Sequence, residues 1–281
     1  MEEKRFACCK FTIQQEKEII EQYKSGLSMA KLGKQWQCDP STIKNILKAY
    51  NEKSRTLSEA RRNTLNYTIN ENIFEKIDTP EKAYWLGVMY SDGYISKRKY
   101  TNNFGLSVAK KDEEWLEKFK KFLNYNGNIH TYEVGEAGYK PGVEYVRLLI
   151  GNNKIVQDLE KLGVVEHKSK KLKKIPDIPY KKDFIRGYID GDGSLRTSYP
   201  HIIICGTFDF LNDIANYFNI NYKIYPDKTI YGLHYNVKES TYLERELYLN
   251  ATYYLERKYK IAQRSFDSPL TLEDVKVISL N

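Results

Sequence analysis

Two nine-residue stretches, Trp85–Gly93 (WLGVMYSDG) and Ile185–Gly193 (IRGYIDGDG), decide how this chain folds. Each is largely apolar, and each carries small residues at its third and seventh positions: Gly87 and Ser91 in the first, Gly187 and Gly191 in the second. Small residues four apart line one face of a helix and allow two helix backbones to approach closely. The two stretches are therefore predicted to be helices that pack against each other through these faces.

The two helices end on acids, Asp92 and Asp192, and each acid is followed by a glycine that allows the chain to turn into a strand. If the helices pack as predicted, the two carboxylates meet at the negative ends of two helix dipoles, where keeping both ionised is costly. A divalent cation resolves this, and hard oxygen ligands favour Mg²⁺ over Zn²⁺. A single Asp-Gly pair indicates only a turn, but the duplicated arrangement predicts a metal site.

The residues around the two stretches repeat the same plan about 100 positions apart. Hydrophobic periodicity predicts, in each half, a helix, two strands, a second helix, two strands and a third helix. The first strand of each half is the one into which the chain turns at Gly93 or Gly193, and three more strands follow it. In the first half the strands are Phe104–Ala109, Asn128–Val134 and Glu144–Ile150, with helices after Asp112 and over Lys154–Leu162. In the second half the strands are His201–Cys205, Tyr222–Tyr225 and Ile230–Val237, with helices over Phe208–Phe218 and Thr241–Leu249.

The first fifty residues are predicted to form three short helices. Thr12 and Gln15 form a capping box for the first, Ser28 caps the second, and Asp39-Pro40 opens the third. The arrangement resembles a helix-turn-helix of the resolvase or sigma-factor kind, which would place the third helix in a DNA major groove. The exposed face of that helix carries side chains that can bond bases or phosphates: Ser41, Thr42, Lys44, Asn45 and Lys48. A three-helix unit that contacts protein is the alternative.

The chain has 281 residues, with 45 Lys and Arg against 37 Asp and Glu, which gives a net charge of +8 and favours a nucleic-acid partner. Its 24 tyrosines suit a wet, polar partner surface. The four cysteines form no CxxC pair, which argues against a zinc site or a disulfide scaffold. With no apolar run long enough for a membrane span and no signal-like start, a soluble cytoplasmic protein is expected.

These features together resemble the LAGLIDADG homing endonuclease family in its single-chain, two-motif form. The second motif is a near-complete match, whereas the first carries Tyr90 where an Asp is usual at the sixth position, which is structural in the family. The resemblance implies an α+β fold of two pseudo-symmetric αββαββα halves with antiparallel DNA-binding sheets. The whole chain is therefore expected to consist of a helix-turn-helix domain (1–52), a basic linker (53–72) and the two halves (73–175 and 176–281).

The family resemblance also implies an activity, the hydrolysis of both strands of a long specific DNA site by a monomer. Asp92 and Asp192 would hold Mg²⁺, for which Mn²⁺ can substitute, and the backbone of residue 91, a serine, stays open as a further ligand. A basic residue serves each half of the site. Position relative to the last helix of each half selects Lys168 and Lys258, although seven lysines lie between positions 168 and 182.

The resemblance places one row of each sheet's side chains on the DNA, and the loop at residues 97–99 is expected to meet phosphates. The polar, basic composition of the linker predicts an arm along the DNA backbone, with a merely solvated linker as the alternative. The expected contacts are Arg61, Arg62, Lys97, Arg98, Lys99, Ser107, Arg147, Arg196, Thr197, Tyr199, His201, Lys223 and Tyr225. The histidines, His130, His167, His201 and His234, have no metal-ligand spacing and are interpreted as surface or groove residues. Two other functions fit the same fold, a DNA-binding regulator that has lost cutting and an RNA splicing maturase. Both acids are present, which favours the nuclease.

Overall fold

The computed structural model describes residues 10–55, 67–99, 101–133 and 142–276 of the chain. The chain divides into two compact units, Met1–Thr68 and Ile69–Asn281. Each unit has its own core and is described by itself below. Across these described ranges, no helix has both the length and the apolar character needed to cross a membrane.

The first unit is built from three helices, α1 (Ile13–Lys24), α2 (Met29–Gln35) and α3 (Pro40–Ala49). The predicted caps are confirmed: Thr12 and Gln15 form the capping box, Ser28 accepts from the Lys31 amide, and Asp39 accepts from the Ser41 amide. The apolar faces of the helices meet in one small core of seven buried residues: Ile19, Ile20, Tyr23, Leu32, Ile43, Ile46 and Leu47.

The segment after α3 folds back onto α1 through Arg55. Its guanidinium lies 3.9 Å from the centre of the Tyr23 ring and donates to the carbonyl oxygens of Tyr23, Gly26 and Leu27. Arg55 therefore adds hydrogen bonds to carbonyl oxygens at the end of α1 and in the turn that follows it. The two arginines of the linker expected to meet DNA, Arg61 and Arg62, lie outside the described residues.

The second unit begins with a half that has the predicted order of elements. The helices are α5 (Pro80–Ser91), α6 (Glu113–Phe122) and α7 (Asn153–Lys161), with a 3₁₀ turn, η1, at Lys110–Asp112. The strands β1 (Gly93–Ser96), β2 (Asn103–Ala109), β3 (His130–Glu133) and β4 (Glu144–Gly151) form an antiparallel sheet in the order β1-β2-β4-β3. Alternate residues of β2 are buried against α6 and α7, and the other face of the sheet carries the polar side chains.

The second half repeats this plan. Its elements are α8 (Lys181–Asp192), β5 (Gly193–Leu195), β6 (Ile202–Gly206), α9 (Phe208–Phe218), β7 (Lys223–Asp227), β8 (Ile230–Tyr235) and α10 (Val237–Tyr248). The sheet order is β5-β6-β8-β7, again antiparallel, with α9 and α10 against it. The α+β class with two antiparallel sheets is thus confirmed. The predicted ends of β8 and α10 were wrong, because the chain leaves the sheet at Asn236, which is the N-cap of α10.

After α10 the chain continues through α11 (Glu256–Ala262), a 3₁₀ turn, η3, at Gln263–Ser265, and the short helix α12 (Leu272–Val275). A further 3₁₀ turn, η2 at Lys168–Lys170, lies between α7 and α8. The turn η2 and the helix α11 carry the two lysines expected at the site. The two lysines occupy matching places, because η2 follows α7, the last helix of the first half, and α11 follows α10, the equivalent helix of the second half.

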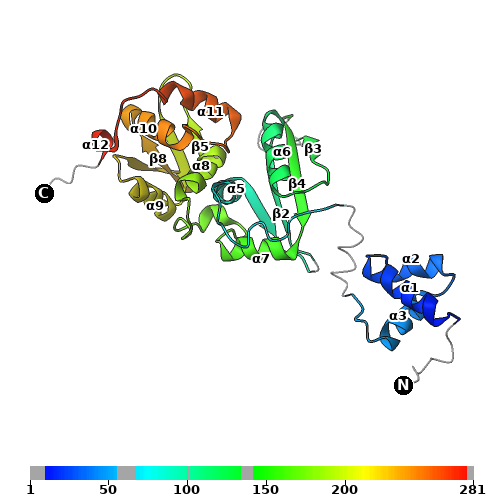
Figure 1. Cartoon of the computed structure of the whole chain (residues 1–281). Helices are drawn as coiled ribbons and strands as arrows, with labels where there is room; N and C mark the ends of the chain where they lie inside the picture. The colour runs from blue at the N-terminus through cyan, green and yellow to red at the C-terminus, as the bar shows by residue number, and fades with distance from the viewer. Residues whose placement is uncertain (1–9, 56–66, 100, 134–141, 277–281) are drawn as a thin grey trace. The chain divides into compact units, whose positions relative to one another are not determined.

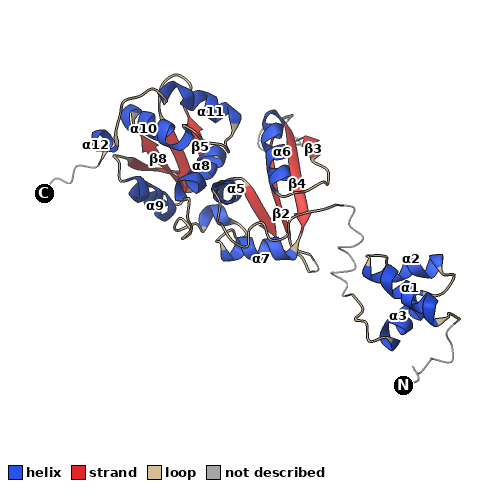
Figure 2. Ribbon diagram, in the orientation of Figure 1, coloured by secondary structure: helices blue, strands red, loops and turns tan. Residues whose placement is uncertain are grey.

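The helices α5 and α8 lie side by side between the two sheets, as Figures 1 and 2 show. Gly87 faces the backbone of α8 and Gly187 faces the backbone of α5, and neither position has room for a side chain. A β-carbon on Gly191 would lie 2.0 Å from the Ser91 hydroxyl oxygen. The small residues therefore line the helix contact as the sequence predicts, and they bring the C-terminal ends of both helices together.

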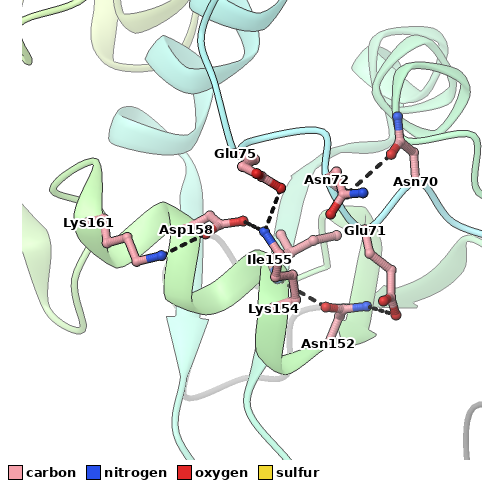
Figure 3. Close-up of polar contacts among 9 residues, drawn as sticks. All are labelled: Asn70, Glu71, Asn72, Glu75, Asn152, Lys154, Ile155, Asp158 and Lys161. Atoms are coloured by element: carbon pink, nitrogen blue, oxygen red, sulfur yellow. Dashed lines mark hydrogen bonds and ion pairs between the residues drawn. The ribbon is translucent and has the colours of Figure 1, made fainter. Parts of the chain in front are cut away.

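A polar cluster, drawn in Figure 3, attaches the start of the second unit to α7. Asn152 caps α7 through the Ile155 amide and donates to Glu71 at 2.8 Å. Lys154 bridges Glu75 at 2.9 Å and Asp158 at 2.6 Å. The Asp158 carboxyl is buried, and this burial would raise its pKa, but hydrogen bonds from Lys154 and Lys161 hold its pKa below the usual value. These contacts make residues 70–75 part of the folded half.

Candidate active site at the ends of the paired helices

The two motif acids end adjacent helices. Asp92 is the C-cap of α5, and Asp192 is the last residue of α8. A β-carbon on Gly191 would lie 3.0 Å from Asp92 Oδ2, so the Asp92 side chain rests against the last turn of the partner helix. Asp92 is half-buried. Asp192 as a residue has a larger exposed fraction, although its carboxyl group lies among protein atoms that desolvate it. The structure therefore brings together the two acids that the sequence pairs.

Both carboxyls are more readily protonated than ordinary aspartates. Burial, together with the negative charge of Asp192, raises the pKa of Asp92 to about 6. Burial among the surrounding atoms also raises the pKa of Asp192, against the opposing charges of Lys168 and Lys258. A bound cation would favour the ionised form of both groups, because it adds positive charge where they repel each other.

Lys258 is buried under the end of α8. Its ammonium group donates three hydrogen bonds, to the carbonyl oxygens of Ile189 at 2.5 Å, Asp190 at 2.7 Å and Gly193 at 2.6 Å. Three acceptors use all the N–H groups of a lysine. Burial lowers the pKa of Lys258 to about 8, although the nearby acids oppose this shift.

Lys168 occupies the matching place under the end of α5. It donates to the carbonyl oxygens of Ser91 at 2.6 Å and Gly93, and burial lowers its pKa. Two acceptors leave one N–H of Lys168 without a partner among the described residues. Of the seven lysines from position 168 to position 182, Lys168 alone is buried and Lys181 is half-buried. The other five are exposed: Lys170, Lys171, Lys173, Lys174 and Lys182. The carbonyl oxygen of Ser91 accepts from this lysine and keeps a second lone pair, so residue 91 stays open as a further metal ligand.

The two lysines change the electrostatic reasoning that predicts a metal. Two carboxylates are matched by two ammonium groups within the same cluster, so charge balance alone does not require a cation there. The donor set decides whether a metal fits. No group of three or more His, Cys, Asp or Glu that could hold a metal occurs in the described part of the chain. Mg²⁺, however, is bound through one or two carboxylates together with waters and phosphate oxygens, and the pair Asp92 and Asp192 fits that requirement.

The open face of the first sheet carries a linked group of polar and aromatic side chains. Ser107 lies opposite Arg147 in the strand register, and its hydroxyl is 2.8 Å from the Tyr132 hydroxyl. The Arg147 guanidinium lies 5.2 Å from the centre of the Tyr132 ring, which stacks with Tyr145. The buried Nε of Arg147 has no hydrogen-bond partner among the described residues. Sequence reasoning chose Ser107 and Arg147 but missed Tyr132, which the alternation of β3 could have indicated.

The open face of the second sheet holds a similar group. Arg196 lies 4.9 Å from the centre of the Tyr199 ring, Tyr199 stacks on His201, and His201 lies beside His234. The remaining expected contacts are also at the surface, Thr197, Lys223 and Tyr225 in this half and Lys97, Arg98 and Lys99 in the other. Lys97 is paired with Glu160 at 2.6 Å. In the first unit, Ser41, Lys44, Asn45 and Lys48 are exposed on α3 and Thr42 is half-buried.

Comparisons with known proteins give only distant likenesses. No protein-family model and no curated protein matches the chain. Among solved structures, the LAGLIDADG meganuclease I-AabMI bound to uncleaved DNA is 14% identical, with 66% of this chain and 88% of that chain covered and a TM-score of 0.46. I-SmaMI bound to uncleaveable DNA is also 14% identical, with 66% of this chain and 90% of that chain covered and a TM-score of 0.44. I-DmoI in complex with DNA and calcium is 13% identical, with 69% of this chain and 98% of that chain covered and a TM-score of 0.45. Likenesses this low assign neither a fold nor an activity.

Proposed function

We propose that this chain is a metal-dependent, site-specific DNA endonuclease that cuts both strands of a long target. The observation that carries the proposal is the symmetric cluster at the ends of α5 and α8, where Asp92 and Asp192 meet and each helix end holds a buried lysine. Two acids that only ended helices at turns would not require a buried lysine beside each helix end. Cutting two DNA strands, by contrast, requires two copies of the catalytic groups.

In the proposed reaction, a water oxygen attacks phosphorus, the bond from phosphorus to the 3′ oxygen breaks, and the 3′ oxygen takes up a proton. Asp92 and Asp192 would hold Mg²⁺, which when bound polarises the phosphoryl oxygens, activates the water and stabilises the leaving oxygen. Lys168 has an N–H directed to no described acceptor and can donate it to a phosphate oxygen. Lys258, with its three N–H groups in use, contributes a fixed positive charge.

The open faces of the two sheets supply the proposed DNA surface. Arg147 and Arg196 each lie beside a tyrosine ring, which restricts the guanidinium before DNA binds. An arginine that presents two N–H groups suits guanine in the major groove. The exposed lysines at the edges, including Lys223, would meet phosphates without selecting a sequence.

The first unit is proposed to be a second DNA-binding element, with α3 as its recognition helix. The exposed face of α3 is polar and basic, and no acidic side chain interrupts it from Ser41 to Lys48. This unit would lengthen the recognised site, because its contacts add to those of the two sheets. It has no part in the proposed chemistry.

Cleavage of a randomised DNA duplex library in Mg²⁺, followed by sequencing of the cut ends, tests the proposed function. The expected result is one family of related sites with both strands cut at a fixed spacing, and no cutting when EDTA removes the metal. A protein that selects a DNA sequence but leaves both strands intact would instead be a regulator. Selective binding to RNA alone would point to a maturase.

A further inference from the structure

The sixth positions of the two motifs hold different residues, Tyr90 on α5 and Asp190 on α8, and both side chains are buried. Asp190 is 1% exposed and Tyr90 is 4% exposed. Neither is one of the paired acids, which lie two positions further along each motif. What each residue contacts indicates why a buried acid is present in one half and a phenol in the other.

The Asp190 carboxylate accepts three hydrogen bonds. Two come from the hydroxyl groups of Tyr84 at 2.8 Å and Tyr248 at 2.7 Å, and the third comes from the backbone N–H of Leu255 at 2.7 Å. Tyr84 in turn accepts from the Trp115 indole at 2.7 Å, which fixes the phenol. Such full satisfaction makes the carboxylate a rigid anchor.

Leu255 is the N-cap residue of α11, and no side chain of that helix caps its N-terminus. Asp190 therefore caps α11 from a different helix, and a negative charge is favoured at that end. The first turn of α11 carries Lys258, whose ammonium donates back to the Asp190 carbonyl at 2.7 Å. Asp190 therefore binds the N-terminus of α11 through its side-chain carboxylate and binds Lys258 through its backbone carbonyl.

Tyr90 makes the opposite kind of bond in the first half. Its hydroxyl donates to the carbonyl oxygen of Leu162, the C-cap of α7. The next residue, Gly163, has φ +97°, and a β-carbon there would lie 2.1 Å from the Tyr90 hydroxyl oxygen. From this fixed point the chain continues directly to Lys168 under the end of α5.

We propose that the sixth motif residues are positioning residues, with Asp190 setting the place of Lys258 through α11 and Tyr90 setting the place of Lys168 through the end of α7. One half anchors a helix N-terminus and needs an acceptor. The other anchors a helix C-terminus and needs a donor. The inference rests on the proposed function, because it assumes that each lysine serves the cutting of one DNA strand.

The test measures the cutting rate of each strand separately, on a target duplex labelled on both strands, with the full chain in Mg²⁺. The variants Lys168→Met and Lys258→Met first identify the strand that each lysine serves. Asp190→Asn should then slow the Lys258 strand about tenfold or more relative to the other, and Tyr90→Phe should slow the Lys168 strand, because small misplacements at a reacting centre are costly. The ratio of the two strand-cutting rates separates positioning from a general loss of stability, because unfolding would slow the cutting of both strands equally.

A second readout does not depend on activity. Amide hydrogen exchange of the full chain should show faster exchange at residues 255–258 in Asp190→Asn, with α9 unchanged as an internal control. Tyr248→Phe, which removes one donor and keeps the carboxylate, serves if Asp190→Asn does not fold, and it should affect the same strand more weakly. Equal slowing of both strands, or unchanged exchange at residues 255–258, overturns the inference. A wild-type chain that cuts no DNA overturns the proposed function instead. Hydrogen exchange at residues 255–258 then still tests whether Asp190 holds the start of α11.

Discussion

Gly87 and Gly187 are equivalent points of one close helix crossing. A β-carbon on Gly87 would lie 2.0 Å from the Phe184 carbonyl oxygen, and one on Gly187 would lie 2.0 Å from the Tyr84 carbonyl oxygen. The obstructing atoms are backbone, so they cannot rotate away. This reciprocal contact brings Asp92 and Asp192 together, and it explains why the crossing tolerates no larger residue.

Replacing Gly187 with alanine should therefore destabilise the second unit. The helices must move apart to admit the methyl group, and overpacking of this kind costs roughly 1–3 kcal/mol of unfolding free energy or more. The measurement is urea unfolding, with Gly206→Ala as the matched control. An added β-carbon at Gly206 meets only side-chain atoms, at 3.1 Å or more. Equal losses in the two variants would contradict a backbone-limited crossing.

The raised pKa of Asp92 predicts a stability effect in the absence of metal. Its carboxyl has a pKa of about 6 when folded against 3.8 normally, so between these values the folded state binds more protons than the unfolded state. The contribution of Asp92 to stability therefore falls as pH rises from about 4 to 6. Asp92→Asn should stabilise the metal-free protein at pH 7, on the order of 2 kcal/mol, and this gain should vanish at pH 4. Thermal unfolding in EDTA at both values measures it.

Removing residues 1–68 should leave the second unit folded and able to cut, while weakening DNA binding and its salt dependence. A chain that begins at Pro80 should instead be unstable. It would lack the contacts of Glu71 and Glu75 with α7 and the buried side chains of Ile73, Phe74 and Ile77, each worth roughly 1.5–3 kcal/mol. Circular dichroism and gel-shift titration follow the two effects. Full affinity in the shorter chain would show that the first unit does not contact DNA.

Arg147→Met should relax the preference for one base pair of the target, at a cost of about 1–3 kcal/mol for the preferred base. The side chain lies on the open face of the sheet beside Tyr132. Lys121→Met, an exposed position on α6 on the covered side of the sheet, is the control and should bind as the wild type does. Binding to a set of single-base variants makes the comparison. A uniform loss over all variants would assign Arg147 to a phosphate.

The sequence predicts most of the fold because the signals are local. The caps at Thr12, Ser28 and Asp39 depend on neighbours a few residues away, and so does the spacing of four between the small residues of each motif. The site is only partly predictable. Lys258 and Lys168 are held by backbone carbonyls, which leave no trace in residue types. The bond between Asp190 and Leu255 spans 65 positions. The charge balance that these lysines provide could not be inferred from the acids alone.

The most direct test of the account is the effect of Asp192→Asn on cutting and on binding, measured on the same target duplex. The substitution removes a carboxylate charge and little volume, so the fold and the DNA surface should persist. We expect binding in Ca²⁺ to stay within a few-fold of the wild type, and double-strand cleavage in Mg²⁺ to be lost. Cleavage of both strands at the wild-type rate by Asp192→Asn would contradict the proposed active site.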